Sequence, residues 1–450
     1  SIILSFTLVC IYHILKQSYI IVLYFKKNSK AETMQNKNKY SCINEFDPSA
    51  LDEVKAIARI TKSIKQIDKS EKVNIKQSFG RVCFENIKSK ISIPSFRNSA
   101  MDGYAVNISQ LKKNNYILKQ TGISLAGKPY IKKLKEKETI RVMTGSLIPQ
   151  NCDAVIMKEM VQIRKSSITF PDTIKKNQNI RFIGEDIKKN NLIIKKGKVI
   201  DYIDLGILSS IGISTVKVFA KPIVSFFSTG DELVSITKRL RKGEIYDSNR
   251  YLLFGLLSKL PVIIKDMGVV RDNELAISNK LKECSKISDV IITTGGVSVG
   301  DADFIKSALK KVGEINFWKI SIKPGRPLAF GKINKAKFFG LPGNPVSAAI
   351  TFQLFVIPAI EKMLCSRKHK KLIIKAKLVT NLTKKKGRIE YKRAILTHDN
   401  GDYIVNTTGL QGSNILTSLA SANCYIRLSA ETDKVKKGDY VDTLPFDIEI

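Results

Sequence analysis

The stretch Asp289-Val-Ile-Ile-Thr-Thr-Gly-Gly-Val-Ser-Val-Gly-Asp-Ala-Asp303 decides the fold class, because an apolar, β-branched run passes directly into a glycine-rich acidic loop. A helical pattern over residues 303–312 follows. The same order of strand, loop and helix recurs from residue 221 to residue 364, with strands expected at 223–228, 262–270, 289–294 and 337–341. Short apolar strands that alternate with helices are typical of a parallel sheet covered on both faces. The sequence therefore predicts a doubly wound parallel α/β domain over residues 221–364.

Three other regions surround this domain. Residues 46–220 begin with an amphipathic helical pattern at 47–67 and continue with short alternating strands, which predicts a linker and β-rich domains. Residues 372–450 alternate again and predict a small C-terminal β domain. Residues 1–33 are apolar as far as residue 24, but Lys16 interrupts the run and the chain begins with Ser. We expect them to be an extension outside the functional fold, with a membrane anchor or an uncleaved signal as the alternative.

The composition narrows the function classes. The 450-residue chain carries a formal net charge of +36, yet its lysines are scattered and form no tract with interleaved aromatic residues. We therefore expect general lysine enrichment and no nucleic-acid partner, with a basic nucleic-acid binder as the alternative. Seven cysteines without a CxxC pair argue against a disulfide framework and a structural zinc site. They fit a reducing compartment, so we expect a cytoplasmic protein.

The loops of the α/β domain follow its expected strands, where an open α/β sheet holds a ligand. Hydroxyl groups and backbone amides in these loops can contact a ligand, and glycine lets the backbone approach a phosphate. A turn that is merely capped by its acidic residues is the alternative. The candidate substrate contacts here are Thr229, Gly230, Asp247, Gly295, Gly296 and Ser298.

The carboxylates of the same loops predict a metal. Asp301 and Asp303 would repel a bare phosphate but fit one that is bridged by Mg²⁺. The alternative is that they only cap the following helix. None of the three histidines lies in the acidic loops, so only oxygen ligands remain, and these favour Mg²⁺. The expected metal ligands are Asp301, Asp303 and Glu232.

Two further loops predict oxyanion binding. Lys323-Pro-Gly-Arg-Pro327 places two cations on a rigid turn, which suits phosphate or molybdate. Gly340-Leu-Pro-Gly-Asn-Pro-Val-Ser347 ends a strand and opens a helix, so its amides can hold another oxyanion, with Pro342 and Asn344 as candidate contacts. A purely structural turn is the alternative for this second loop.

A second polar cluster is expected in the β-rich part. Asn98-Ser-Ala-Met-Asp-Gly-Tyr104 places Asp102 beside a glycine and an aromatic residue, and Arg141-Val-Met-Thr-Gly145 and Arg181-Phe-Ile-Gly-Glu-Asp186 add further polar groups. The two clusters could be halves of one crevice. Whether one folded chain or two subunits would build that crevice stays open at this level.

Taken together, these loops resemble those of the molybdopterin molybdenumtransferase family, which includes bacterial MoeA enzymes and the E domains of gephyrin and of the plant molybdenum insertase. The similarity runs from about residue 46 to residue 446. It is carried by Asn98-Ser-Ala-Met-Asp-Gly-Tyr-Ala105, Gly184-Glu-Asp186, Phe227-Ser-Thr-Gly-Asp-Glu-Leu233, Gly295-Gly-Val-Ser-Val-Gly300 and Gly340-Leu-Pro-Gly-Asn-Pro-Val-Ser347. The resemblance implies insertion of molybdate into adenylylated molybdopterin with Mg²⁺-dependent release of AMP. It also implies a homodimer whose active site combines the α/β domain of one subunit with the N-terminal β domain of the other. A molybdopterin adenylyltransferase and acceptor molybdoenzymes are possible partners.

The resemblance also assigns residues. Asp102, Thr144, Asp186, Glu232, Asp272 and Asp303 fall on or near the acidic and hydroxyl positions that the family uses for activity. The region that resembles the family's molybdate site contains Lys323, Arg326, Pro327, Arg388 and Ser413. The family usually has Lys where this chain has Arg326, which keeps the charge but puts molybdate affinity in doubt.

Other functions would need different features. A related adenylyltransferase shares the glycine-rich α/β domain but normally lacks the Ser99-Ala-Met-Asp-Gly-Tyr104 half and a C-terminal β domain. A scaffold that clusters partner proteins, as the gephyrin E domain does, would not require the full set of acidic loops. The sequence therefore favours the transferase.

Overall fold

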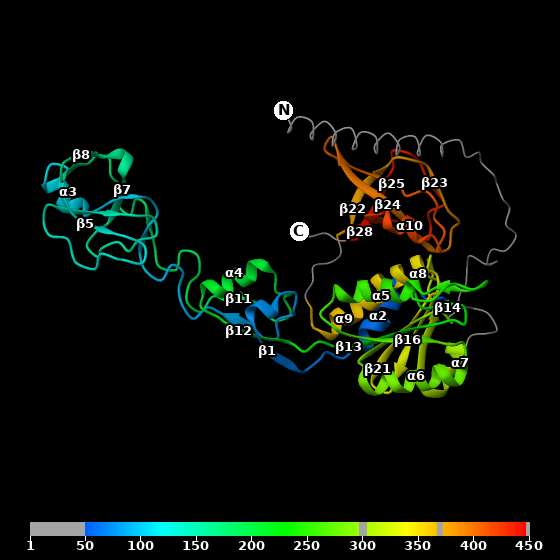
Figure 1. Ribbon diagram of the computed structural model, residues 1–450. Coiled ribbons are helices and arrows are strands. Elements are labelled where there is room, and N and C mark those ends of the chain that lie inside the picture. The colour runs from blue at the N-terminus through cyan, green and yellow to red at the C-terminus, as the bar shows by residue number, and fades with distance from the viewer. Residues whose placement is uncertain (1–49, 297–303, 367–371, 447–450) are drawn as a thin grey trace, which may run out of the picture. The chain divides into compact units, whose positions relative to one another are not determined.

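The α/β domain is built on a six-stranded sheet. The computed structural model describes residues 50–296, 304–366 and 372–446 (Figure 1). The central strands of the six-stranded sheet are parallel and lie in the order β16 (Ile263–Val270), β13 (Ile223–Thr229), β17 (Val290–Thr294) and β21 (Ala336–Leu341). The α/β fold class is thus confirmed, with the strands close to their expected positions.

The sheet extends further than the sequence predicts. β20 (Pro327–Ile333) pairs antiparallel with β21, and β18 (Glu314–Lys319) pairs antiparallel with β20. The β20–β21 connection is a two-residue turn in which Asn334 has φ of 52°, a conformation that Asn tolerates and that favours a tight hairpin. The parallel sheet therefore carries an antiparallel edge.

Helices cover both faces of this sheet (Figure 1). α6 (Glu274–Ile287) and α7 (Phe304–Val312) bury Ile277, Leu281 and Ile305 against one face. The other face is covered by α5 (Ser248–Ser258) and by a continuous helical stretch made of α8 (Pro345–Thr351), the π-helical turn Phe352–Val356 and α9 (Ile357–Met363). Among the described residues, this stretch is the only helix long and apolar enough to span a membrane, but 72% of its apolar window is buried, as in a core helix.

The first helix packs on the same face. α2 (Glu53–Ser63), blue in Figure 1, contacts α9 and places Ala56 and Ile60 in the core, and its C-cap Ile64 is buried there too. It is shorter than the sequence predicts, because Leu51 is already engaged: its N–H donates to Lys319 O and its carbonyl accepts from Ser321 N. The helix therefore begins after the cap Asp52, whose Oδ1 accepts from Val54 N over 2.8 Å.

A linker region connects this first helix to a β-rich insertion. β1 (Ser70–Asn74) pairs antiparallel with β12 (Thr215–Phe219), and β2 (Ile87–Lys88) with β11 (Leu192–Ile194). α4 (Tyr202–Ser210) packs on them and begins with a capping box at Asp201. Because the outgoing and returning strands pair, everything between them forms an insertion with adjacent ends.

The insertion is the N-terminal β domain. Its six-stranded sheet has the order β7 (Ala154–Met157), β4 (Gly103–Val106), β6 (Glu138–Val142), β5 (Ile117–Ser124), β9 (Ser167–Thr169) and β8 (Gln162–Arg164). α3 (Ile108–Lys113) packs beside it, and β3 (Asn98–Ser99) pairs with β10 (Ile180–Arg181) where the chain enters and leaves. The turn before β4, which contains Asp102, and the turn after β6, which contains Thr144, carry the polar cluster expected there.

The C-terminal domain is a small barrel. β24 (Ile389–Asp399), β25 (Asp402–Thr407), β22 (Ile374–Leu378), β28 (Tyr440–Pro445) and β26 (Cys424–Leu428) pair in that order, and β26 returns to pair with β24. β19 (Ile322–Lys323), from the α/β domain, adds to β24 in parallel. The smaller elements are β23 (Leu382–Thr383), β27 (Lys434–Val435) and α10 (Leu416–Ala420). The barrel is therefore joined through its own sheet to the cationic loop at residue 323.

Candidate active site

The strand ends of the α/β domain form one edge on which glycine and threonine meet. Gly295 and Gly296 follow β17 with φ of 86° and 62°, and a Cβ on Gly295 would lie 2.4 Å from the carbonyl oxygen of Thr229. Thr229 ends β13 and is buried, and Thr294 donates to Ser228 Oγ over 3.0 Å. Only glycine permits this close approach, so the backbone amides of the loop stay near the edge of the sheet.

Three carboxylates gather beside Thr229. Asp272 follows β16, and its N–H donates to Asp231 Oδ1 over 3.3 Å, while Glu232 lies in the turn after β13. Burial raises the pKa of Asp272 above its ordinary value, and the charges of Glu232 and Asp231 raise it further. Thr229 acts in the opposite direction, although its hydroxyl oxygen has no hydrogen-bond partner of ordinary geometry. The sheet edge is therefore a place where negative charge accumulates.

The beginning of α5 adds two buried oxygen acceptors. Asp247 caps the helix through Oδ1, which accepts from Arg250 N over 3.1 Å, and its Oδ2 is buried without a partner. Asn249 donates to Gly343 O over 2.6 Å, which fixes its amide and leaves its own carbonyl oxygen unpartnered. Gly343 and the buried Pro342 belong to the loop that follows β21. The hydrogen bond from Asn249 therefore joins α5 to this loop.

The same loop contacts the C-terminal barrel. Asn344 Nδ2 donates to Ser413 Oγ over 2.9 Å, and Val346 N donates to Ser413 O over 3.1 Å. Asn344 and Ser413 are 69 positions apart. The structure thus brings together two candidate residues that the sequence placed in different domains.

The cationic loop is a tight turn between β19 and β20. Gly325 has φ of 107°, and a Cβ there would lie 2.7 Å from Thr351 Cγ2, so the turn requires glycine. Lys323 lies opposite Glu390 in the β19–β24 pairing, and its Nζ is 3.7 Å from Glu390 Oε1. Arg388 precedes β24, and Pro327 begins β20 directly after Arg326. The loop therefore collects positive charge at the junction of the α/β domain and the barrel.

The polar cluster of the N-terminal β domain is centred on Asp102. Its Oδ1 accepts from Thr144 N over 2.8 Å and from Thr144 Oγ1 over 2.9 Å. These hydrogen bonds lower the pKa of Asp102 below its ordinary value, with smaller contributions from Lys158 and Arg141. Asp186 is exposed after β10 and is not part of this hydrogen-bonded group. Asp102 is therefore held ionised in a fixed orientation, whereas Asp186 stands apart.

The metal prediction rests mostly on residues that the structure does not describe. Ser298, Asp301 and Asp303 lie within 297–303, outside the described residues, as does the apolar segment 1–33. In the described part of the chain, no three His, Cys, Asp or Glu side chains form a group that could hold a metal ion. Glu232 remains as a candidate ligand beside Asp272 and Asp231.

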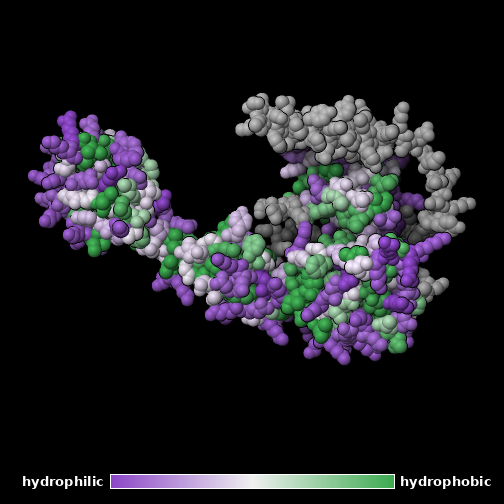
Figure 2. Space-filling view, viewed as in Figure 1, coloured by the Kyte–Doolittle hydropathy of each residue, from purple (hydrophilic) through white to green (hydrophobic). Residues whose placement is uncertain are grey.

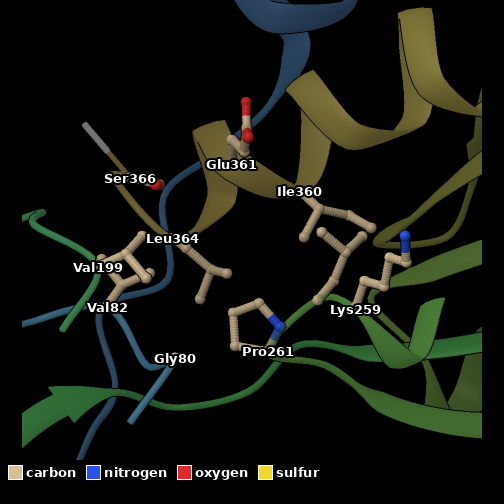
Figure 3. A pocket seen from close by; sticks show the side chains of 10 residues that line it. Gly80, Val82, Val199, Lys259, Pro261, Ile360, Glu361, Leu364 and Ser366 are labelled. Atoms are coloured by element: carbon tan, nitrogen blue, oxygen red, sulfur yellow. The ribbon is translucent and has the colours of Figure 1, made fainter. Parts of the chain in front are cut away.

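A separate small cavity carries none of this chemistry. It has a volume of about 100 Å³ and is lined mainly by apolar groups such as Val82, Pro261 and Leu364 (Figure 3). Lys259 and Glu361 line it as well, and each of them has an interaction partner. The strand-end edge is therefore the better candidate for the active site.

Sequence reasoning missed the charged residues of β24. Glu390 and Arg393 are buried, and Lys392 Nζ lies 2.9 Å from Glu390 Oε1. Arg393 orders the loop that carries Ser413, because it donates to Leu410 O, Gly412 O and Ser418 Oγ. The alternating charges at residues 388, 390 and 392 were the only sequence pattern that could have indicated these residues. Their relation to Lys323 becomes visible only through the pairing of β24 with β19.

Family models match nearly the whole described chain. Residues 51–212 match the MoeA N-terminal region (domain I and II), residues 225–362 a probable molybdopterin binding domain, and residues 375–446 the MoeA C-terminal region (domain IV). The three matches follow the order of the linker and N-terminal β domain, the α/β domain and the barrel.

Individual relatives are similar to this chain over most of its length. The chain is 43% identical over 380 residues to a molybdopterin molybdenumtransferase of Haemophilus influenzae, covering 84% of this chain and 94% of the relative. It is 31% identical to gephyrin of Dictyostelium discoideum, covering 83% of this chain and 59% of that protein. A crystal structure of a molybdopterin biosynthesis moeA protein from Pyrococcus horikoshii OT3 superposes with a TM-score of 0.76 at 30% identity, covering 88% of this chain and all of the other.

Proposed function

The chain belongs to the MoeA family of molybdopterin molybdenumtransferases and is a transferase of molybdenum cofactor biosynthesis, and on this premise we propose that it inserts molybdate into adenylylated molybdopterin with Mg²⁺-dependent release of AMP. The observation that carries the proposal is the carboxylate cluster of Asp272, Glu232 and Asp231 beside the Gly295–Gly296 backbone. A phosphate approaching those amides needs a cation between it and the carboxylates.

The donor set fits Mg²⁺. The groups at the edge offer oxygen alone, and Asp272 Oδ1 is buried without a hydrogen-bond partner. Mg²⁺ commonly uses one or two carboxylates together with water and substrate phosphates, so a cage of three protein ligands is not required. Asp272 and Glu232 would hold the ion, with Asp301 and Asp303 as further candidates. When bound, Mg²⁺ would offset the phosphate charge of the adenylate.

The chain's own residues then have separate tasks. The backbone of Gly295 and Gly296 admits the phosphate, and the carboxylate of Asp272 or Glu232 orients water toward the adenylate phosphorus. Lys323, Arg326 and Arg388 attract the molybdate dianion, and Ser413 is fixed next to Asn344 to contact it. The reaction is thus promoted chiefly by positioning and by electrostatic stabilisation.

The proposal includes a homodimer. Asp102 is held ionised in the N-terminal β domain, on a sheet separate from the one that carries Asp272. Hydrophobic residues are also exposed among hydrophilic ones (Figure 2), and Tyr251 and Phe254 on α5 are each 50% exposed. A second copy of the chain could cover such surfaces and supply Asp102 to the site. We place the protein in the cytoplasm, with a molybdopterin adenylyltransferase as the source of its substrate and molybdoenzymes as acceptors of its product.

The test is AMP release by the full chain. Purified protein is mixed with adenylylated molybdopterin and Mg²⁺, with and without molybdate, and AMP is measured. We expect molybdate-dependent release that Asp272→Asn slows about 100-fold. Asp402→Asn, which changes an exposed carboxylate of the barrel hairpin, should leave the release intact. Release that is independent of molybdate, or equal in both variants, would refute the proposed site.

A further inference from the structure

We propose that Glu390 is a positioning residue of the oxyanion subsite. Its carboxylate pairs with the ammonium group of Lys323 when no oxyanion is bound, and it thereby weakens oxyanion binding. The inference rests on the proposed function, because it takes Lys323, Arg326 and Arg388 as the groups that attract molybdate. The inference adds Glu390, whose negative charge has the same sign as that of the oxyanion. A site that attracted the oxyanion through cations alone would not include such a residue.

Strand pairing fixes the position of Glu390. β19 and β24 are parallel, with Ile322 opposite Ile389 and Lys323 opposite Glu390. Lys323 Nζ lies 3.7 Å from Glu390 Oε1, and the side chain of Lys323 is 51% exposed while that of Glu390 is only 8% exposed. The carboxylate is therefore rigid and the ammonium is mobile, so Lys323 is the partner that can turn toward an arriving anion.

A second lysine holds the carboxylate in place. Lys392 Nζ lies 2.9 Å from the same Oε1, and its side chain is 12% exposed. Glu390 and Lys392 are two positions apart on β24 and so share a face of the strand. A buried ion pair of this kind keeps its geometry, because breaking it would leave an uncompensated charge. Lys323 is thus the exposed, exchangeable partner and Lys392 the permanent one.

Competition follows from this geometry. An oxyanion that binds Lys323 must share the ammonium with Glu390 and approach a second negative charge only a few ångströms away. Coulombic repulsion at such distances is substantial near a protein surface, even though salt reduces it for exposed groups. Removing the Glu390 charge also removes its ion pair with Lys323, but a half-exposed ion pair contributes little free energy. This loss is therefore smaller than the gain from relieving the repulsion. Removing the charge of Glu390 should therefore tighten oxyanion binding.

The experiment measures binding of molybdate alone to the full chain by titration calorimetry. We expect Glu390→Gln to bind molybdate about tenfold more tightly than wild type, equal to about 1.4 kcal/mol. Glu314→Gln is the matched control, because Glu314 also pairs with a lysine, Lys332 at 3.3 Å, but on the exposed edge strand β18. It removes the same net charge and should leave the affinity unchanged. In turnover, Glu390→Gln should lower the molybdate KM without raising kcat.

The outcomes separate this inference from the proposed function. Equal or weaker binding by Glu390→Gln overturns the inference, since a purely structural role predicts weakening. If wild type binds molybdate and Lys323→Met does not, the subsite stands whatever Glu390 does; if neither Lys323→Met nor Arg388→Met changes binding, the subsite itself fails. Should Glu390→Gln not fold, Glu390→Asp withdraws the carboxylate by one methylene and should bind about twofold more tightly.

Discussion

The side-chain amide of Asn344 donates a hydrogen bond to the hydroxyl of Ser413 over 2.9 Å, across the junction between the α/β domain and the C-terminal barrel. The backbone reinforces this contact, since Val346 N donates to Ser413 O. The loop at the end of β21 and the loop before α10 therefore form one surface. A ligand that rests on this surface contacts both domains.

Ser413→Ala tests this junction. The substitution removes one partly exposed hydrogen bond, so we expect the unfolding free energy to fall by about 1 kcal/mol or less. If Ser413 contacts molybdate, the molybdate KM should rise about fivefold while the KM for the pterin substrate stays constant. Steady-state assays with each substrate varied separately measure the two constants. A parallel rise in both would contradict a specific role in oxyanion binding.

Asp102 and Thr144 predict a pH dependence. Because hydrogen bonds from Thr144 lower the pKa of Asp102 below 3.8, the ionised form favours the folded state. The stability that this gives is present above the ordinary pKa and is lost as the pH falls through the lowered pKa. Thr144→Val removes the hydroxyl donor and should move the pKa back up, which carboxyl-carbon NMR titration would follow. Thr397→Val, on an exposed part of β24, should leave the Asp102 titration unchanged.

Asp272 predicts the opposite sign. Its pKa is raised, so folding favours the protonated carboxyl: the stability is present below the ordinary pKa and is lost as the pH rises through the raised value. Asp272→Asn should therefore raise the melting temperature at neutral pH while lowering the AMP-release rate by about 100-fold. Thermal scans at pH 5 and pH 8 check the stability part, because the gain should be larger at pH 8.

Mg²⁺ provides a control for the same residue. If the ion binds beside Asp272, millimolar Mg²⁺ should raise the melting temperature of wild type, since a ligand that binds only the folded state stabilises it. The increase should shrink in Asp272→Asn and persist in Asp402→Asn. An equal increase in all three proteins would place the ion elsewhere.

Arg393 predicts a large structural effect. It is 1% exposed, and its guanidinium donates to two carbonyl oxygens and to Ser418 Oγ rather than to a carboxylate. Arg393→Met removes the donor from Leu410 O and Ser418 Oγ and leaves Gly412 O with the N–H of Ile415 alone. It should lower the unfolding free energy by about 2–4 kcal/mol. Urea titration measures the change, with Lys437→Met, an exposed position of the same domain, as the control expected to lie near zero. A small effect would mean that the loop around Ser413 is ordered without Arg393.

Much of the fold follows from sequence, because strand-then-helix alternation is local. The four parallel strands and the helices on both faces were predicted, since their apolar residues recur at the spacing that burial requires. The edge formed by β18 and β20 was not predicted. Its residues lie around the proline-rich turn 323–327, where periodicity is short and the partner strand is chosen by hairpin geometry.

Candidate residues were also easier to find than the relations among them. The loop of Thr229 and the loop of Gly295 were both singled out, but only the structure shows a Cβ of Gly295 meeting the Thr229 carbonyl oxygen. Glu390 was missed because its role depends on Lys323, 67 positions away, which reaches it through sheet pairing. Contacts of this kind leave no local pattern that a reading of spacing could detect.

The contact of α2 with the barrel has a consequence for synthesis on the ribosome. Arg427 Nη2 donates to Glu53 Oε2 over 3.1 Å, and Tyr391 Oη donates to Glu53 Oε1, so the carboxylate finds its partners up to 374 positions later. At roughly 5–20 residues per second, translation needs about 20–75 s to cover that distance. During this interval, the Glu53 carboxylate of α2 lacks the hydrogen-bond partners that it has in the folded protein. The apolar face of α2 also lacks its final packing neighbours. The contacts that bury the Glu53 carboxylate can thus form only after the barrel strands that carry Tyr391 and Arg427 have been synthesised.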